Sequence, residues 1–117
     1  MYEIKFQENE IKMLLFLIRQ YKKHLDMPLE DDTRVIDYLE NLSKKVFADE
    51  NLDTDDLHML LGIVEKYDRK LDAKIEDNFD ARVLCYDMKM KLYQALNIRK
   101  EFIFDKDPRE QGNSKTR

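Results

Sequence analysis

Hydrophobic residues recur at helical spacing in four segments of the chain, and polar stretches separate these segments. The first segment, residues 11–25, carries a broad apolar stripe made of Ile11, Leu14, Leu15, Leu17, Ile18, Tyr21 and Leu25. Similar stripes predict helices over residues 33–47, 54–77 and 80–99. Each helix must bury its apolar face against another element. The pattern therefore predicts an all-α fold, an antiparallel bundle of about four helices with the first helix at its centre.

The ends of these helices also have sequence signals, because short polar side chains before a helix can accept hydrogen bonds from its free backbone amides. Pro28 ends the first helix. N-caps are expected at Asn9, at Asp32 or Thr33, at Asp53 or Thr54, and at Asp80. Residues 104–117 are polar and have no period, so residues 1–103 are predicted to form a single domain that a disordered tail follows.

Composition supports this fold class and limits the kinds of molecule that the chain is expected to bind. Charged residues make up 39% of the chain, which has only two glycines and two prolines, and this suits amphipathic helices better than β-structure. The net charge of −4 gives no overall attraction to nucleic acid or to an anionic membrane. The longest apolar run, Met13–Ile18, is far shorter than the roughly 20 residues of a membrane span. We expect a cytoplasmic protein in which Cys85 is a buried, reduced thiol.

The sequence predicts no metal site and no cofactor. Asp49, Asn51, Asp53 and Asp55 imitate part of a calcium loop, but the glycine and the final glutamate of such loops are missing. The segments Asp37-x-x-Glu40 and Glu65-x-x-Asp68 leave an enzyme as an alternative, because paired carboxylates on two helices bind magnesium in all-α nucleoside triphosphate pyrophosphatases. The direction of the side chains counts against this enzyme alternative, because Asp37 and Glu40 project from the polar side of their helix.

Asp68 lies on the apolar stripe of the third predicted helix, and a buried carboxylate needs a partner. We expect Asp68 either to reach solvent from the edge of the stripe or to pair with Lys22, which intrudes on the stripe of the first helix.

A basic ridge on the first helix offers a second candidate surface, made of Lys12, Phe16, Arg19 and Lys23. Three cations around an aromatic ring could bind nucleic acid. However, Asp55 and Asp56 would stand at the reading end of any helix-turn-helix pair, where they would repel phosphate. Nucleic acid is thus an alternative that the sequence does not favour.

The fourth predicted helix has a second apolar stripe that one bundle contact cannot cover. This stripe consists of Val83, Tyr86, Met90 and Tyr93, and Met59 and Ile63 lie at the edge of the apolar face of the third predicted helix. These six are the candidate partner-binding residues, and Lys89 and Lys91 would form a charged rim around them. The "EFIF" segment that follows could cover this face instead. The expected function is a small, non-catalytic protein that binds another protein, as a regulator or inhibitor encoded by a bacterium or phage. A homodimeric scaffold that uses the same face is the nearest alternative.

Overall fold

The computed structural model describes residues 4–24, 32–72 and 78–110, and these residues form an all-α fold. Four helices follow one another: α1 (Glu8–His24), α2 (Asp32–Phe47), α3 (Thr54–Asp72) and α4 (Phe79–Ala95). A short 3-10 turn, η1 (Lys100–Phe102), comes after them. The predicted all-α, four-helix class is confirmed.

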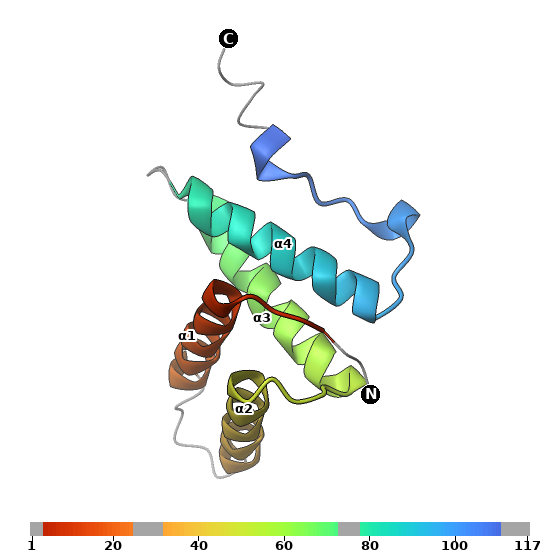
Figure 1. Cartoon of the computed structure of the whole chain (residues 1–117). Helices are drawn as coiled ribbons and strands as arrows, with labels where there is room; N and C mark the ends of the chain where they lie inside the picture. Colours follow the sequence, from red (N-terminus) through yellow and green to blue (C-terminus); the bar gives the residue numbers. More distant parts are fainter. Residues whose placement is uncertain (1–3, 25–31, 73–77, 111–117) are drawn as a thin grey trace.

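The helices pack as two antiparallel pairs. Helices α1 and α2 rise side by side from one side of α3, and α4 runs along another side of α3 (Figure 1). Helix α1 contacts both α2 and α3, while α3 contacts both α1 and α4. The central place that the sequence predicts for the first helix is therefore shared between α1 and α3.

The buried core comes from the predicted apolar stripes. It includes Leu14 and Ile18 of α1, Leu39 and Leu42 of α2, and, from α3 and α4, Leu57, Leu60, Val64, Cys85, Met88 and Leu92. Two members of the predicted stripe of the second helix are exceptions, because Val35 is 36% exposed and Phe47 is 74% exposed. Val35 lies in the first turn of α2, and Phe47 is the last residue of this helix. The predicted stripe residues Leu25 and Ile75 lie outside the described residues.

Two predicted N-caps are wrong. Helix α1 begins at Glu8, before the predicted cap Asn9, because the carboxylate of Glu10 reaches back and accepts a hydrogen bond of 2.7 Å from the Gln7 amide. Helix α4 follows the N-cap Asn78, not Asp80. The Asn78 side-chain amide donates to the carbonyl oxygen of Leu71 at 2.8 Å, and this bond joins the start of α4 to the last turn of α3.

The predicted cap of the third helix is confirmed at Asp53. Its carboxylate accepts from the Asp56 amide at 2.8 Å, and Asp56 accepts from the Asp53 amide at 3.1 Å, so the two residues form a reciprocal capping box.

Helix α4 ends at Ala95, short of the predicted Arg99. The reason is Asn97, whose φ of 62° reverses the chain and lets the Ile98 amide donate to the Tyr93 carbonyl at 2.9 Å.

Asp56 also connects α2 to α3. Its side chain is 1% exposed and accepts hydrogen bonds from the Tyr38 hydroxyl at 2.8 Å and from Lys45 Nζ at 3.0 Å. Burial alone would raise the pKa of Asp56, but the hydrogen bonds from Lys45, the Asp53 amide and Tyr38 hold it below its usual range. From the sequence, Asp56 is an ordinary acidic residue in the first turn of α3. In the structure it is buried and connects α3 to α2.

Candidate functional site

The six predicted partner-binding residues do not form one exposed face. Tyr93 is 7% exposed and Ile63 is 5% exposed, so both belong to the core of the monomer. Val83, Tyr86 and Met90 of α4 are partly exposed, and so is Met59 of α3. The predicted face is divided into an α4 part and an α3 part.

The C-terminal segment, residues 99–110, covers part of the α4 face. In Figure 1 it runs back along α4. Asp105 accepts a hydrogen bond from the Tyr93 hydroxyl at 3.0 Å and forms an ion pair with Lys89. Arg109 pairs with Asp87 at 2.9 Å, where both residues belong to the surface. Residues 104–110, which the sequence assigns to a disordered tail, thus lie against α4 through polar contacts.

Lys89 is the centre of these contacts, although the sequence places it on an exposed rim. It is 5% exposed and donates to Asp68 at 2.7 Å as well as to Asp105. Burial would lower the pKa of Lys89, but the hydrogen bonds from Lys89 to Asp105 and Asp68 outweigh it and raise this pKa above its usual value. Burial and the Asp105 carboxylate likewise raise the pKa of Tyr93.

The expected partnership between Asp68 and Lys22 is wrong. Asp68 pairs with Lys89, and Lys22 pairs with Glu40 across the α1–α2 contact at 3.4 Å. The periodicity of α3 shows that Asp68 needs a partner, but it does not show which of its two neighbouring helices supplies one. Lys91, the other predicted rim residue, pairs with the buried carboxylate of Glu10 and so connects α4 to the start of α1.

The carboxylates of the enzyme alternative are spread over separate contacts. Glu40 pairs with Lys22, Glu65 accepts from the Tyr93 hydroxyl at 3.3 Å, and Asp68 pairs with Lys89, while Asp37 is exposed on α2. Within the described ranges, no three His, Cys, Asp or Glu side chains are grouped in a way that could hold a metal ion.

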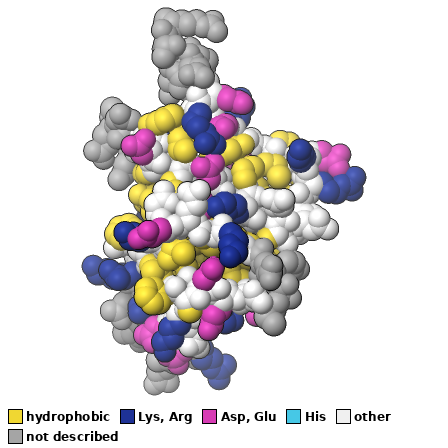
Figure 2. All heavy atoms as spheres, viewed as in Figure 1, with side chains coloured by type: hydrophobic (Ala, Val, Ile, Leu, Met, Phe, Trp, Pro, Cys, Tyr) yellow, Lys and Arg dark blue, Asp and Glu magenta, His cyan; other side chains and the backbone are white. Residues whose placement is uncertain are grey.

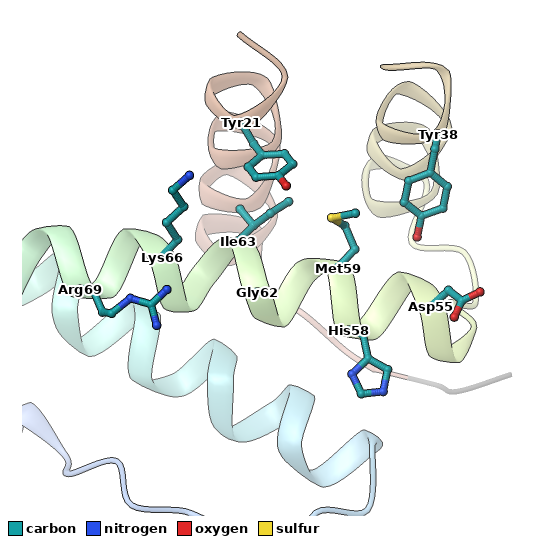
Figure 3. Close-up of a pocket in the computed structure, with 9 residues that line it drawn as sticks. All are labelled: Tyr21, Tyr38, Asp55, His58, Met59, Gly62, Ile63, Lys66 and Arg69. Carbon is teal, nitrogen blue, oxygen red and sulfur yellow. The ribbon is translucent and has the colours of Figure 1, made fainter. Parts of the chain in front are cut away.

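A recess opens on the side of α3 that faces α1 and α2, and we call it the saddle recess (Figure 3). It has a volume of about 620 Å³ and is lined by Tyr21, Tyr38, Asp55, His58, Met59, Gly62, Ile63, Lys66 and Arg69. Tyr21 from α1 and Tyr38 from α2 face each other across it, and Met59 and Ile63 point up from α3 between them. The α3 part of the predicted partner-binding face therefore lies inside a recess.

Gly62 gives the saddle recess its open floor. A β-carbon built at this position has no atom within 4 Å, apart from its immediate chain neighbours and the backbone of its own helix. No packing requirement within the described structure explains a glycine here, in the interior of a helix, where it costs about 0.5–1 kcal/mol relative to alanine. The α3 backbone is therefore exposed at Gly62.

Charge differs between the two ends of the saddle recess. Lys66 and Arg69 lie at one end, and Asp55 lies near the first turn of α3 at the other (Figure 3). The ammonium of Lys66 is 5.6 Å from the centroid of the Tyr21 ring, which places a cation over an aromatic wall.

A second depression lies between α1 and α2, and we call it the α1–α2 groove. It has a volume of about 420 Å³ and is lined by Leu15, Ile18, Arg19, Lys22, Glu40, Ser43, Lys44 and Phe47. The predicted basic ridge, Lys12, Phe16, Arg19 and Lys23, is exposed as expected, and Arg19 belongs to both features. Sequence periodicity missed Phe47 as a surface residue because it continues the apolar stripe of α2.

The face of the molecule drawn in Figure 2 has no field of a single sign. Cationic and anionic side chains are interspersed there among hydrophobic ones. Charge alone therefore does not mark a binding site on this face.

The described residues thus form a small four-helix fold whose surface depressions include the saddle recess and the α1–α2 groove. Comparisons with known protein families, with curated proteins and with solved structures found no match to the chain. Among the described helices, none combines the length and the apolar character that crossing a membrane requires.

Proposed function

We propose that the chain binds another protein through the saddle recess. The observation that carries this proposal is Gly62, because an exposed glycine in the middle of α3 lowers helix stability and no described neighbour requires it. Aromatic and methionine side chains, which are favoured in protein interfaces, surround this point: Tyr21, Tyr38 and Met59.

The lining of the saddle recess indicates what kind of segment would fit. An apolar side chain of the partner would contact Met59 and the two tyrosines, with its backbone close to Gly62. A carboxylate of the partner would meet Lys66 and Arg69 at the basic end. We therefore propose a partner segment that combines an apolar anchor with an acidic residue.

Binding is favoured over catalysis because the carboxylates that a magnesium enzyme would use already serve structural ion pairs. Glu40 holds Lys22 and Asp68 holds Lys89. A role as a regulator or inhibitor in a bacterium or phage is consistent with a small binding protein. A cytoplasmic setting suits its single buried cysteine.

A photo-crosslinking amino acid at Met59 tests this proposal in a lysate of the native cells. The expected result is a crosslink to one other protein, which mass spectrometry identifies, and no such crosslink from the exposed control position Glu101. Binding of the purified partner is then measured by calorimetry with Gly62→Ala and Gly62→Gln. The larger glutamine should weaken binding more than alanine does, at unchanged helix content by circular dichroism.

Two outcomes would overturn the proposal. Equal affinity for the wild type and Gly62→Gln would mean that the partner does not use the saddle recess. A crosslink from Met59 to a second copy of the chain, together with a dimer by light scattering, would support the homodimeric alternative.

A further inference from the structure

We infer that the α1–α2 groove is a second docking surface, which fits an acidic, amphipathic helix of a partner protein. The groove shares no lining residue with the saddle recess, so this inference goes beyond the proposed function and stands independently of it. If both surfaces are used, the chain can hold two protein segments at once.

Charge is the first argument. The chain as a whole has a net charge of −4, yet the groove and the adjoining ridge carry five cations, Lys12, Arg19, Lys22, Lys23 and Lys44. Only two carboxylates pair with them, Glu8 with Lys12 and Glu40 with Lys22. Within the described part of the chain, Arg19, Lys23 and Lys44 form no ion pair. This local excess of positive charge is complementary to an acidic partner.

Exposed aromatic rings are the second argument. Phe47 is 74% exposed beside the groove, and Phe16 is 46% exposed on the ridge. The α1 side of the groove is apolar at Leu15, which is partly exposed, and at Ile18, which is 1% exposed, and we call these two residues its apolar floor. Large exposed apolar side chains next to a groove are typical of protein-binding surfaces, where they act as anchors.

The length of the α1–α2 groove is suited to a short helix. Its lining residues on α1 run from Leu15 to Lys22, and those on α2 run from Glu40 to Phe47, so each side spans about two helical turns. A partner helix can place apolar residues at positions i, i+4 and i+7 over this length. Acidic residues on its flanks would then face Arg19 and Lys44.

The apolar floor favours a protein over a nucleic acid. A phosphate backbone would meet the cations but would gain nothing from Leu15 and Ile18, and Glu40 would repel it. Stacking of bases on Phe16 and Phe47 needs no floor between the rings. We therefore assign the α1–α2 groove to an acidic protein helix, and single-stranded DNA serves as the competing probe.

A display library of random 16-residue peptides tests the assignment with the full chain as bait. Peptides are kept if they bind the wild type and fail to bind the double variant Arg19→Glu/Lys44→Glu. Their affinities are then measured by fluorescence anisotropy against four single variants: Phe47→Ser and Lys44→Glu in the groove, and the matched controls Phe102→Ser and Lys100→Glu, which are exposed in η1.

The expected peptides are acidic, with apolar residues at helical spacing. Phe47→Ser and Lys44→Glu should each weaken their binding by about tenfold, and the two controls should leave it unchanged within about twofold. Thermal unfolding by circular dichroism checks that each variant is folded. Affinity should also fall as salt increases.

Three results would overturn the inference. The counter-selection could leave no binder, the retained peptides could bind Phe47→Ser as well as they bind the wild type, or an oligo(dT) strand could bind the groove more tightly than any selected peptide. Because Gly62 and Met59 lie outside the groove, failure here leaves the saddle recess untouched, and failure of the saddle recess leaves this test valid.

Discussion

Replacing Gly62 with alanine should stabilise the protein. Gly62 lies inside α3, and the added β-carbon would meet open space, so the substitution introduces no clash. Alanine loses less backbone freedom on folding than glycine does, and the expected gain in the free energy of unfolding is about 0.5–1 kcal/mol.

This gain can be converted into a melting temperature. A chain of 117 residues has an unfolding entropy of about 0.25 kcal/mol/K at about 2.1 cal/mol/K per residue, so Tm should rise by about 2–4 °C. Differential scanning calorimetry and urea unfolding measure the two quantities. As a matched control, Gln94→Ala at an exposed site of α4 should change stability by less than about 0.5 kcal/mol. A loss of stability in Gly62→Ala would refute the open recess, because it would mean that a neighbouring atom occupies that space.

Three further predictions follow from the buried polar groups. Asp56→Asn should lower the free energy of unfolding by about 1–3 kcal/mol near neutral pH. The pKa of Asp56 is lower in the folded protein than the ordinary value of about 3.9, so the wild type should lose this advantage as pH falls below about 4. Urea titrations in which the wild type stays more stable than Asp56→Asn at low pH would contradict this. Asp105→Ala should speed hydrogen exchange of the amides in residues 103–110, whereas the control Glu101→Ala should not; equal protection in both would show that Asp105 does not hold the segment. Burial raises the pKa of Cys85 to about 12, so a thiol reagent should label it only after unfolding, and fast labelling of the native protein would disprove its burial.

Periodicity predicted the helices well because the core of this protein is built from ordinary amphipathic stripes. Leu14 and Ile18 are buried as their spacing requires, and Asp53 caps α3 as its short carboxylate suggests. The pattern failed at the ends of stripes. Phe47 continues the spacing of α2 but is 74% exposed at the last residue of this helix, because burial depends on a covering neighbour as well as on spacing.

The candidate site was harder to predict because its parts come from distant positions. In the sequence, Gly62 is only a residue that lowers the stability of its helix. The arrangement of α1 and α2 around α3 shows that it lines a recess. The sequence pattern predicted Met59 at the surface, and this residue is partly exposed, but the same pattern joined it to residues of α4 that do not form one exposed surface with it. Which helices enclose a residue is set by tertiary packing, and local spacing has no information about it.

Lys89 shows how the same limit affects which apolar surface of the protein stays open. The sequence pattern predicts Lys89 on the exposed rim of an interface. Two carboxylates, one from α3 and one from the C-terminal segment, allow its ammonium group to be buried instead. Those contacts bring Asp105 over Tyr93 and so cover part of the α4 stripe that the sequence leaves open. Asp105, in a segment that the sequence assigns to a disordered tail, thus serves as a counter-charge for Lys89. With part of α4 covered, the large apolar side chains that stay exposed include Phe16 and Phe47, beside the α1–α2 groove, and Phe102 and Phe104 in the C-terminal segment. Tertiary packing therefore decides which part of an apolar stripe stays open.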